Sequence, residues 1–350
     1  MKASELLIVG VPDAELGEET RKLLGELRPG GVILFARNLA SEAQLSGLVR
    51  ALKEVLPEGL LYLDAEGGRV DRLRGIVGPA PAAALLARQP STLAFEAGRW
   101  VGFSLRAFGF DVDLAPVVDL DHGHTGNALD QRTFGASPRP VVARAGAFLR
   151  GLGAAGVGGC LKHFPGLGAA RQDTHDEGAG IALTARQLER ELAPFRRLGD
   201  EAGAVMASHA SYPRLDRQRR PASLSPPIAT DLLRGRLGFA GVLFSDDLDM
   251  HALDTWGSVA ERAEAALVAG CDGLFVCHSL AEAPAAAERL SARALAPRVT
   301  EARARFALYR ARLRRLAQVA PVPLAEVKRR LAELQARAAE AGATAQSPRV

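Results

Sequence analysis

Two adjacent carboxylates, Asp246 and Asp247, follow an apolar run that begins at Gly241. Successive side chains of a strand point to opposite sides, so only one of the two can face the interior of a barrel. The other is expected to cap or orient the segment that follows. A carboxylate at a strand end can serve as a nucleophile, and a structural role for both is the alternative. The spacing leaves open which of the two is reactive.

A second candidate group is the pair Asp173 and His175, which follows the Gly- and Pro-containing stretch Lys162–Gly168. A carboxylate can accept the ring N–H of a neighbouring histidine, fix its tautomer and stabilise the imidazolium. The histidine is then a usable general acid/base near neutral pH. An Asp-x-His pair in a loop is often incidental, but its place after an apolar run favours a catalytic role.

Asp64 ends a third apolar run, and Glu66, two glycines and Arg69 follow it. A carboxylate in this position can chelate adjacent hydroxyl groups of a sugar. A helix N-cap explains the same residue equally well. The residues alone therefore give two interpretations of Asp64, sugar binding and helix capping.

Two further patterns have the residue types of known sites but are interpreted as structural. Gly151, Gly153 and Gly156 match GxGxxG, yet they precede an apolar run, whereas a dinucleotide-binding loop follows its strand. The stretch Asp119–His124 contains two aspartates and two histidines, as a metal site would. Its glycine and the polar residues after it favour a hydrated loop.

The 350 residues are 48% hydrophobic and 24% charged, as in ordinary globular proteins, and no apolar run is long enough to span a membrane. A soluble, cytoplasmic protein is expected. Cys160, Cys271 and Cys277 lie in apolar stretches, which favours buried thiols over a disulfide framework or a metal site. The densest basic stretch, Arg303–Arg315, alternates with apolar residues at helical spacing. It predicts a solvated helix face and no nucleic-acid partner.

The elements that must position these groups are short apolar runs separated by segments of helical periodicity. Eight such runs are Leu6–Val11, Gly31–Phe35, Leu60–Asp64, Val112–Val117, Val157–His163, Ala204–His209, Gly241–Asp246 and Asp272–Cys277. The clearest helices between them are Glu18–Leu27, Ser41–Leu56, Thr92–Phe108, Pro140–Ala155, Thr184–Ala202 and Val259–Ala269. Eight alternations of strand and helix predict an α/β fold, a (β/α)8 TIM-type barrel, and a doubly wound open sheet is the alternative.

The C-terminal part, from Thr300 to Ala341, is helical and broken near Pro321 and Pro323, and a frayed tail is expected from Gly342. We therefore divide the chain into a catalytic barrel, residues 1–318, and a helical extension with its tail, residues 319–350. In a barrel of this kind catalysis occurs at the carboxyl ends of the strands. The candidate groups above lie at or just after such ends.

Taken together, these motifs resemble glycoside hydrolase family 3, and within it the single-domain bacterial exo-β-N-acetylglucosaminidases. The stretches that carry the resemblance are Asp64–Val70, Leu114–Asp119, Arg132–Gly135, Lys162–Gly168, Asp173–His175, Arg220–Ser223 and Gly238–Met250. The resemblance implies a (β/α)8 barrel. It also implies that Asp246 is the catalytic nucleophile and that Asp173 and His175 form the acid/base dyad. The positions that it assigns to the sugar are Asp64, Arg132, Lys162, His163 and His209.

By the same resemblance the protein is a retaining enzyme that releases non-reducing terminal N-acetylglucosamine from cell-wall fragments through a covalent glycosyl-enzyme intermediate. Its partner is a small carbohydrate, and neither a metal nor an organic cofactor is implied. A phosphorylase or a broader β-glycosidase using the same site is an alternative. A non-catalytic glycan-binding protein is an alternative of another class. It is motivated by Leu167, Ala65 and Asp130, where the family has histidine, glutamine and glycine.

Overall fold

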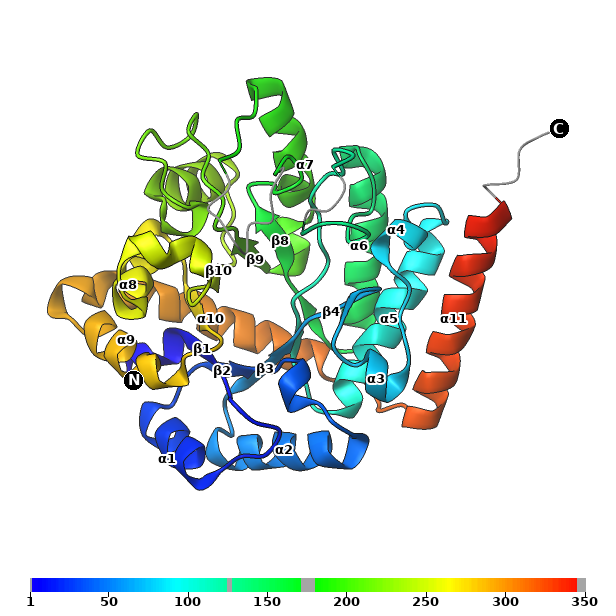
Figure 1. The fold of residues 1–350 in the computed structure, drawn as a ribbon, viewed down its shortest axis with the longest axis horizontal. Helices are drawn as coiled ribbons and strands as arrows, with labels where there is room; N and C mark the ends of the chain where they lie inside the picture. The colour runs from blue at the N-terminus through cyan, green and yellow to red at the C-terminus, as the bar shows by residue number, and fades with distance from the viewer. Residues whose placement is uncertain (1, 125–127, 171–179, 345–350) are drawn as a thin grey trace.

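The computed structural model describes residues 2–124, 128–170 and 180–344. Within these ranges, nine parallel strands form one sheet in the order β7-β6-β3-β2-β1-β11-β10-β9-β8 (Figure 1). The strands are β1 (Leu7–Gly10), β2 (Gly31–Ile33), β3 (Leu60–Leu63), β6 (Val112–Asp113), β7 (Gly158–Gly159), β8 (Leu161–Phe164), β9 (Ala204–Ala207), β10 (Val242–Asp247) and β11 (Gly273–Val276). All eight predicted runs therefore contain strands.

The two ends of the sheet belong to one stretch of chain. Strand β7 pairs with β6, and β8 pairs with β9, and only Cys160 separates β7 from β8. The predicted run Val157–His163 thus contacts both neighbouring strands, first one and then the other. The sheet closes on itself through this run, as the (β/α)8 barrel requires. The predicted fold class is confirmed, and the open doubly wound sheet is not the architecture.

Aromatic side chains fill the interior of the barrel. The ring centroid of Tyr62 lies 5.7 Å from that of Phe244 and 5.6 Å from that of Phe275, in edge-to-face contacts. Glycines on the neighbouring strands leave room for these rings. A Cβ atom at Gly31 would lie 2.6 Å from the Tyr62 ring, and one at Gly273 would lie 2.5 Å from Phe244. Aromatic rings packed against glycines thus form the core that supports the strand ends.

Helices surround the sheet on its outer side (Figure 1). They are α1 (Glu18–Leu27), α2 (Glu42–Val55), α3 (Arg74–Val77), α4 (Ala83–Leu86), α5 (Ser91–Ala107), α6 (Pro138–Ala154), α7 (Ala185–Ala202), α8 (Val259–Ala269), α9 (Ala283–Leu290), α10 (Ala296–Leu316) and α11 (Leu324–Thr344). Shorter helical segments are η1 (Ala3–Leu6), η2 (Ala36–Asn38), η3 (Ala222–Leu224), η5 (His251–Trp256), η6 (Leu280–Glu282) and η7 (Arg293–Leu295), and η4 (Pro227–Arg236) is a π-helix. The six predicted helices lie within two residues of observed bounds. Three of them, α2, α7 and α8, begin after side-chain caps at Ser41, Thr184 and Ser258.

Helix α10 closes the barrel at the amino ends of the strands. The rings of Phe306 and Tyr309 contact Phe244 at centroid distances of 5.9 and 6.1 Å. Two arginines of the same helix, Arg310 and Arg312, donate to backbone carbonyls that precede the strands, in two loops and in the last turn of α7. The carbonyl oxygens belong to Gly30, Glu58, Asp200 and Glu201.

The solvated helix face predicted for Arg303–Arg315 is therefore wrong for these two residues. Both arginines are partly buried, because the helix crosses the barrel base next to the backbone carbonyl groups that precede the strands. The guanidinium groups donate to these carbonyls. The basic character of this stretch thus serves the closure of the barrel.

The C-terminal helices agree with the predicted break at Pro321 and Pro323, since α10 ends before it and α11 begins after it. Helix α11 packs on α5 and is joined to it by an ion pair of 2.6 Å between Arg337 and Glu96. The helix continues through Thr344, so the tail does not begin at Gly342 as predicted. No helix in the described ranges has the length and apolar character needed to cross a membrane.

Candidate active site

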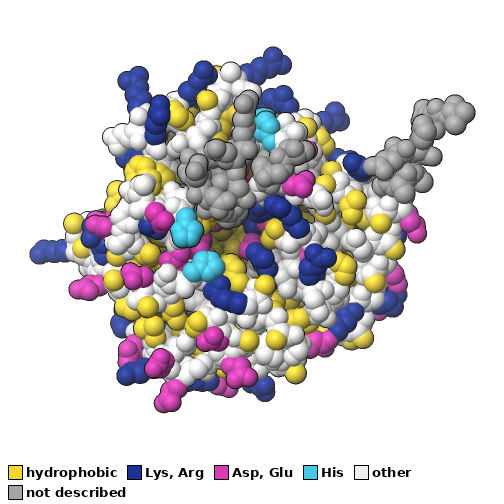
Figure 2. All heavy atoms as spheres, in the orientation of Figure 1, with side chains coloured by type: hydrophobic (Ala, Val, Ile, Leu, Met, Phe, Trp, Pro, Cys, Tyr) yellow, Lys and Arg dark blue, Asp and Glu magenta, His cyan; other side chains and the backbone are white. Residues whose placement is uncertain are grey.

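The predicted site residues of the described chain gather at one end of the barrel. Asp64 follows β3, Lys162 and His163 lie in β8, and Asp246 lies in β10. Because the strands are parallel, their carboxyl ends meet on the same face. Figure 2 shows acidic, basic and histidine side chains around a hollow near the middle of the face that it presents.

Lys162 is the centre of a buried ionic network. Its side chain is 4% exposed, and its Nζ lies 2.7 Å from Oδ1 of Asp64 and 2.6 Å from Oε1 of Glu66. Burial alone would lower the pKa of Lys162, but the two carboxylates raise it above its usual value, so the side chain stays cationic. Asp64 is followed by strand β4 (Ala65–Gly67), which pairs with β5 (Val70–Asp71), and not by a helix. The helix-capping interpretation of Asp64 is therefore wrong.

Glu66 links Lys162 to Arg132. The Arg132 guanidinium donates from Nε and Nη2 to the two oxygens of Glu66, at 2.8 and 2.7 Å. Burial alone would raise the pKa of Glu66, but Arg132 and Lys162 hold it well below its usual range. Sequence reasoning noted Glu66 only as a polar residue at a strand end. Its function as the shared anion of two cations depends on contacts 66 residues apart in the chain.

Asp119 holds His163 in place. The carboxylate of Asp119 accepts the ring Nδ1–H of His163 at 2.8 Å and its backbone N–H at 3.1 Å. It also accepts the backbone N–H of Leu167 at 2.7 Å. Asp119 has no exposed surface, so the hydrated loop predicted at this residue is wrong. Because the Leu167 contact uses the backbone, the replacement of histidine by leucine leaves this anchor of the loop intact.

The two adjacent carboxylates of β10 have different surroundings. Asp247 Oδ1 accepts the backbone N–H groups of Asp249 at 3.1 Å and of Cys277 at 3.0 Å. It therefore orients the segment that follows, as predicted for one member of the pair. Burial raises the pKa of Asp247 to about 7, and the charges of Asp249 and Asp246 act in the same direction. Asp246 accepts the backbone N–H of Asp247 at 2.9 Å.

His209 lies just after β9 and is 2% exposed. Its Nδ1 is 2.7 Å from the hydroxyl oxygen of Ser223, and its Nε2 is 2.8 Å from the backbone carbonyl oxygen of Asp247. Both ring nitrogens are thus bonded to protein groups. The role predicted for His209, contact with the sugar, stays a prediction.

Asp173 and His175 lie outside the described residues. The described chain ends at Ala170 and begins again at Gly180, which forms a β-bridge with Ser211. Ala170 donates its backbone N–H to Leu167, in the loop anchored by Asp119. The chain on both sides of the predicted dyad therefore lies next to β8 and to the segment that follows β9.

The comparison with known proteins decides the family. A sequence profile described as the glycosyl hydrolase family 3 N terminal domain matches residues 1–315. The chain belongs to glycosyl hydrolase family 3. It is a glycoside hydrolase, and the resemblance seen in the motifs is confirmed.

Relatives in family 3 match across most of the chain. A beta-hexosaminidase of Pseudomonas aeruginosa (strain UCBPP-PA14) is 40% identical over 289 residues, 81% of this chain and 85% of that protein. A family 3 beta-N-acetylglucosaminidase from Paenibacillus gives a TM-score of 0.86 at 32% identity, over 95% of this chain and 68% of that one. NagZ from Neisseria gonorrhoeae, solved with N-trifluoroacetyl-D-glucosamine, gives 0.76 at 31% identity, over 96% and 99% of the two chains.

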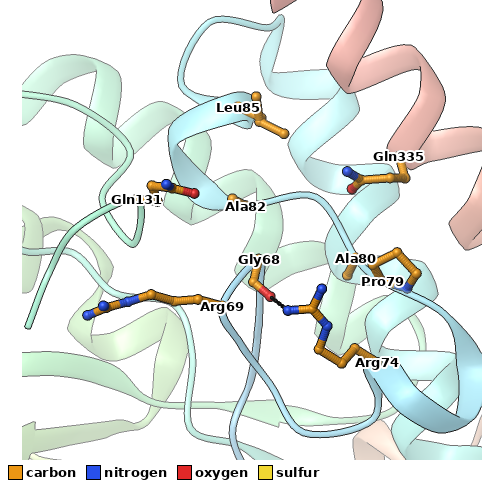
Figure 3. Close-up of a pocket in the computed structure, with 9 residues that line it drawn as sticks. All are labelled: Gly68, Arg69, Arg74, Pro79, Ala80, Ala82, Leu85, Gln131 and Gln335. Carbon is orange, nitrogen blue, oxygen red and sulfur yellow. Dashed lines mark hydrogen bonds between the residues drawn. The ribbon is translucent and has the colours of Figure 1, made fainter.

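A separate cavity of about 250 Å³ lies beside the candidate sugar site of this family 3 chain (Figure 3). Figure 3 shows Arg69 and Arg74 on either side of Gly68, and Arg74 donates to the Gly68 carbonyl at 3.3 Å. Helix α11 contributes Gln335 to the lining. The other lining residues are Pro79, Ala80, Ala82, Leu85 and Gln131. The lining includes none of the predicted site residues that the structure describes.

Neither of the two stretches weighed as metal sites forms one in the described part of the chain, where no group of three or more His, Cys, Asp or Glu side chains is arranged to hold a metal ion. His122 instead lies 2.6 Å from the carboxylate of Glu191. The three cysteines are buried thiols.

Proposed function

We propose that this glycoside hydrolase is a retaining exo-β-N-acetylglucosaminidase that removes non-reducing terminal N-acetylglucosamine from peptidoglycan fragments. The observation that carries the proposal is the buried ionic network of Lys162, Asp64, Glu66 and Arg132 at the barrel mouth, with Asp246 on a strand that ends at the same face. The names of the relatives, beta-hexosaminidase and beta-N-acetylglucosaminidase, support the same sugar.

The network suits the recognition of a neutral, hydroxyl-rich ligand. Glu66 holds both Arg132 and Lys162, so their donors need little reorganisation when a sugar binds. Asp64 supplies an anionic acceptor beside them. Charge-assisted hydrogen bonds to hydroxyl and acetamido groups are about twice as strong as neutral ones. His163, oriented by Asp119, adds a further polar group on β8.

The proposed reaction has two displacements at the anomeric carbon. In the first, the carboxylate of Asp246 bonds to this carbon while the glycosidic bond breaks, and His175 gives its proton to the departing oxygen. Asp173 accepts the other ring N–H and stabilises the protonated histidine. In the second, water gives a proton to His175 and bonds to the carbon, and Asp246 leaves. Two inversions return the β configuration.

An aryl β-N-acetylglucosaminide tests this assignment in the wild type, D246N and H175A. We expect D246N to lower kcat by roughly 10³-fold or more, because no covalent intermediate forms. For H175A we expect a fall of roughly 10²- to 10⁴-fold, the usual range for a general acid/base. The exposed carboxylate Asp231 provides a matched control, D231N, with unchanged kcat. An inactive wild type, or a D246N variant as active as the wild type, contradicts the proposal.

The stereochemistry and the acceptor are tested in the same assay. Proton NMR of the first product should show the β anomer of the free sugar, as retention requires. The appearance of the α anomer first would exclude the covalent route. Turnover that depends on added phosphate and yields a sugar phosphate would identify a phosphorylase instead.

The natural substrate and the compartment form the finer part of the proposal. We expect peptidoglycan fragments with terminal N-acetylglucosamine to be cleaved in the cytoplasm by the barrel, residues 1–318. The three buried thiols support a reducing compartment. Release of N-acetylglucosamine from a purified disaccharide-peptide, compared with chitobiose, measures the preference, and equal rates would remove the support for a cell-wall substrate.

A further inference from the structure

Residue 247 joins the strand that carries Asp246 to both of its neighbours. On the β11 side, its carboxylate accepts the backbone N–H of Cys277 at 3.0 Å. On the β9 side, its backbone carbonyl lies 2.8 Å from Nε2 of His209. Its own N–H donates to Oδ1 of Asp246 at 2.9 Å. The backbone orientation at this residue therefore decides where a hydrogen-bond donor to Asp246 points.

The chemistry of these partners fixes the tautomer of His209. A carbonyl oxygen only accepts, so Nε2 of His209 carries the hydrogen and donates to Asp247. In the neutral ring Nδ1 is then an acceptor, and the Ser223 hydroxyl, 2.7 Å away, donates to it. Ser223 is fully buried, and its backbone N–H donates to the carbonyl of Ser208 at 3.0 Å. The imidazole is thus held between two fixed points.

We infer that His209 is a positioning residue for the nucleophile, acting through the carbonyl of Asp247, and that Ser223 holds its ring in the required orientation. The inference rests on the proposed function, since it takes Asp246 as the nucleophile. It differs from the direct contact with the sugar that the family resemblance implies for His209. Loss of the Nε2 donor frees the peptide between residues 247 and 248, and the backbone N–H of Asp247 can then turn away from the Asp246 carboxylate.

Two amide substitutions separate the ring nitrogens of His209. The amide of H209Q reaches the place of Nε2 and can still donate to Asp247, whereas the shorter amide of H209N lies near the place of Nδ1 and cannot. With the aryl β-N-acetylglucosaminide, we expect H209N to lower kcat by about 10- to 100-fold, the effect of a small misplacement of a reacting group. KM and the inhibition constant of free N-acetylglucosamine should stay within about twofold of the wild type. The kcat of H209Q should be at least tenfold higher than that of H209N.

S223A removes only the bond that orients the ring, so a smaller fall in kcat, about 3- to 10-fold, is expected with the same KM. Its matched control is S291A, which removes an exposed hydroxyl at the end of α9 and should leave kcat unchanged. Because S223A keeps the histidine, it tests the inference even if H209N does not fold.

Equal kcat values for H209N and H209Q would show that the Nε2 donor is irrelevant. A rise in KM and in the inhibition constant with kcat unchanged would show that His209 contacts the sugar instead. An inactive wild type would refute the proposed function but not the positioning, which is then decided by amide hydrogen exchange. Peptides that cover residues 244–249 should exchange faster in H209N than in H209Q, and equal exchange refutes the positioning role.

Discussion

The substitution E66Q removes the anion that Arg132 and Lys162 share. In the wild type Glu66 receives two hydrogen bonds from Arg132, at 2.8 and 2.7 Å, and a contact of 2.6 Å from Lys162. In E66Q the amide oxygen can take the place of Oε1 and keep the contacts with Arg132 Nη2 and Lys162 Nζ, while the amide nitrogen loses the bond from Arg132 Nε. The two buried cations also lose their shared negative charge. Removing one partner of a buried ion pair costs about 3 to 5 kcal/mol, and we expect a loss of this size.

The pH dependence of this loss has a definite sign. The pKa of Glu66 is lowered in the folded protein, so its ionised form stabilises the fold above the unfolded value of about 4.3. That stabilisation is lost as the pH falls below this value. The difference in unfolding free energy between the wild type and E66Q should therefore be largest between pH 6 and 8, and it should shrink at roughly pH 3.5.

Urea denaturation at these pH values measures the difference, with E189Q as the matched control. Glu189 forms ion pairs with Arg196 and Arg236 on the surface, where such pairs contribute about 0 to 1 kcal/mol. A loss below about 1 kcal/mol for E66Q at pH 7 would refute the assignment of Glu66 as the anion that holds the network together. A difference that does not shrink in acid would refute the assigned direction of the pKa shift.

Three further substitutions test other parts of the structure. Burial raises the pKa of Asp247 to about 7, so the free energy of unfolding of the wild type should fall by at most about 4 kcal/mol as the pH rises from about 4 to 7. D247N should abolish this fall, as measured by urea denaturation at pH 5 and 8. F306A should cost about 3 to 5 kcal/mol in the same assay, because it empties the contact between α10 and the barrel interior, and a cost below about 1 kcal/mol would contradict that packing. G151A should lower the free energy of unfolding in the same assay, because its Cβ would collide with the backbone carbonyl of Phe95. G47A is the control on α2, where no atom lies close to the added Cβ, and it should raise the free energy of unfolding by roughly 0.5 to 1 kcal/mol. A change of the same sign in both variants would contradict the close approach of α5 and α6.

Hydrophobic periodicity was sufficient to predict eight strand-helix units, because buried parallel strands are continuously apolar, but it left the open doubly wound sheet as an alternative to the barrel. It could not show that the run Val157–His163 changes partner at Cys160, since pairing depends on which strands lie on either side. It also did not reveal the hairpin of β4 and β5, whose strands are two or three residues long.

For the candidate site too, local sequence patterns could be interpreted, whereas contacts between distant segments could not. Asp64, Lys162 and Asp246 could be proposed as candidates because each is a polar residue at or near the end of an apolar run. The contacts of Glu66 and Asp119 were not found, because each joins segments more than 40 residues apart. The burial of Arg310 and Arg312 was missed for a related reason: a charge pattern marks one face of a helix but not what that face contacts.

The change of partner at Cys160 divides the barrel into two half-barrels, one on each side of this residue. Asp64, Glu66 and Asp119 come from the first half, and Lys162 and His163 come from the second. Three ion pairs of the candidate site therefore cross the junction between the halves, whereas the pair of Arg132 and Glu66 lies within the first half. Neither half alone holds the complete set of candidate site residues, and each would expose open strand edges. If these residues bind the sugar as proposed, binding requires the closed barrel, and its recovery during refolding would report when the two halves join.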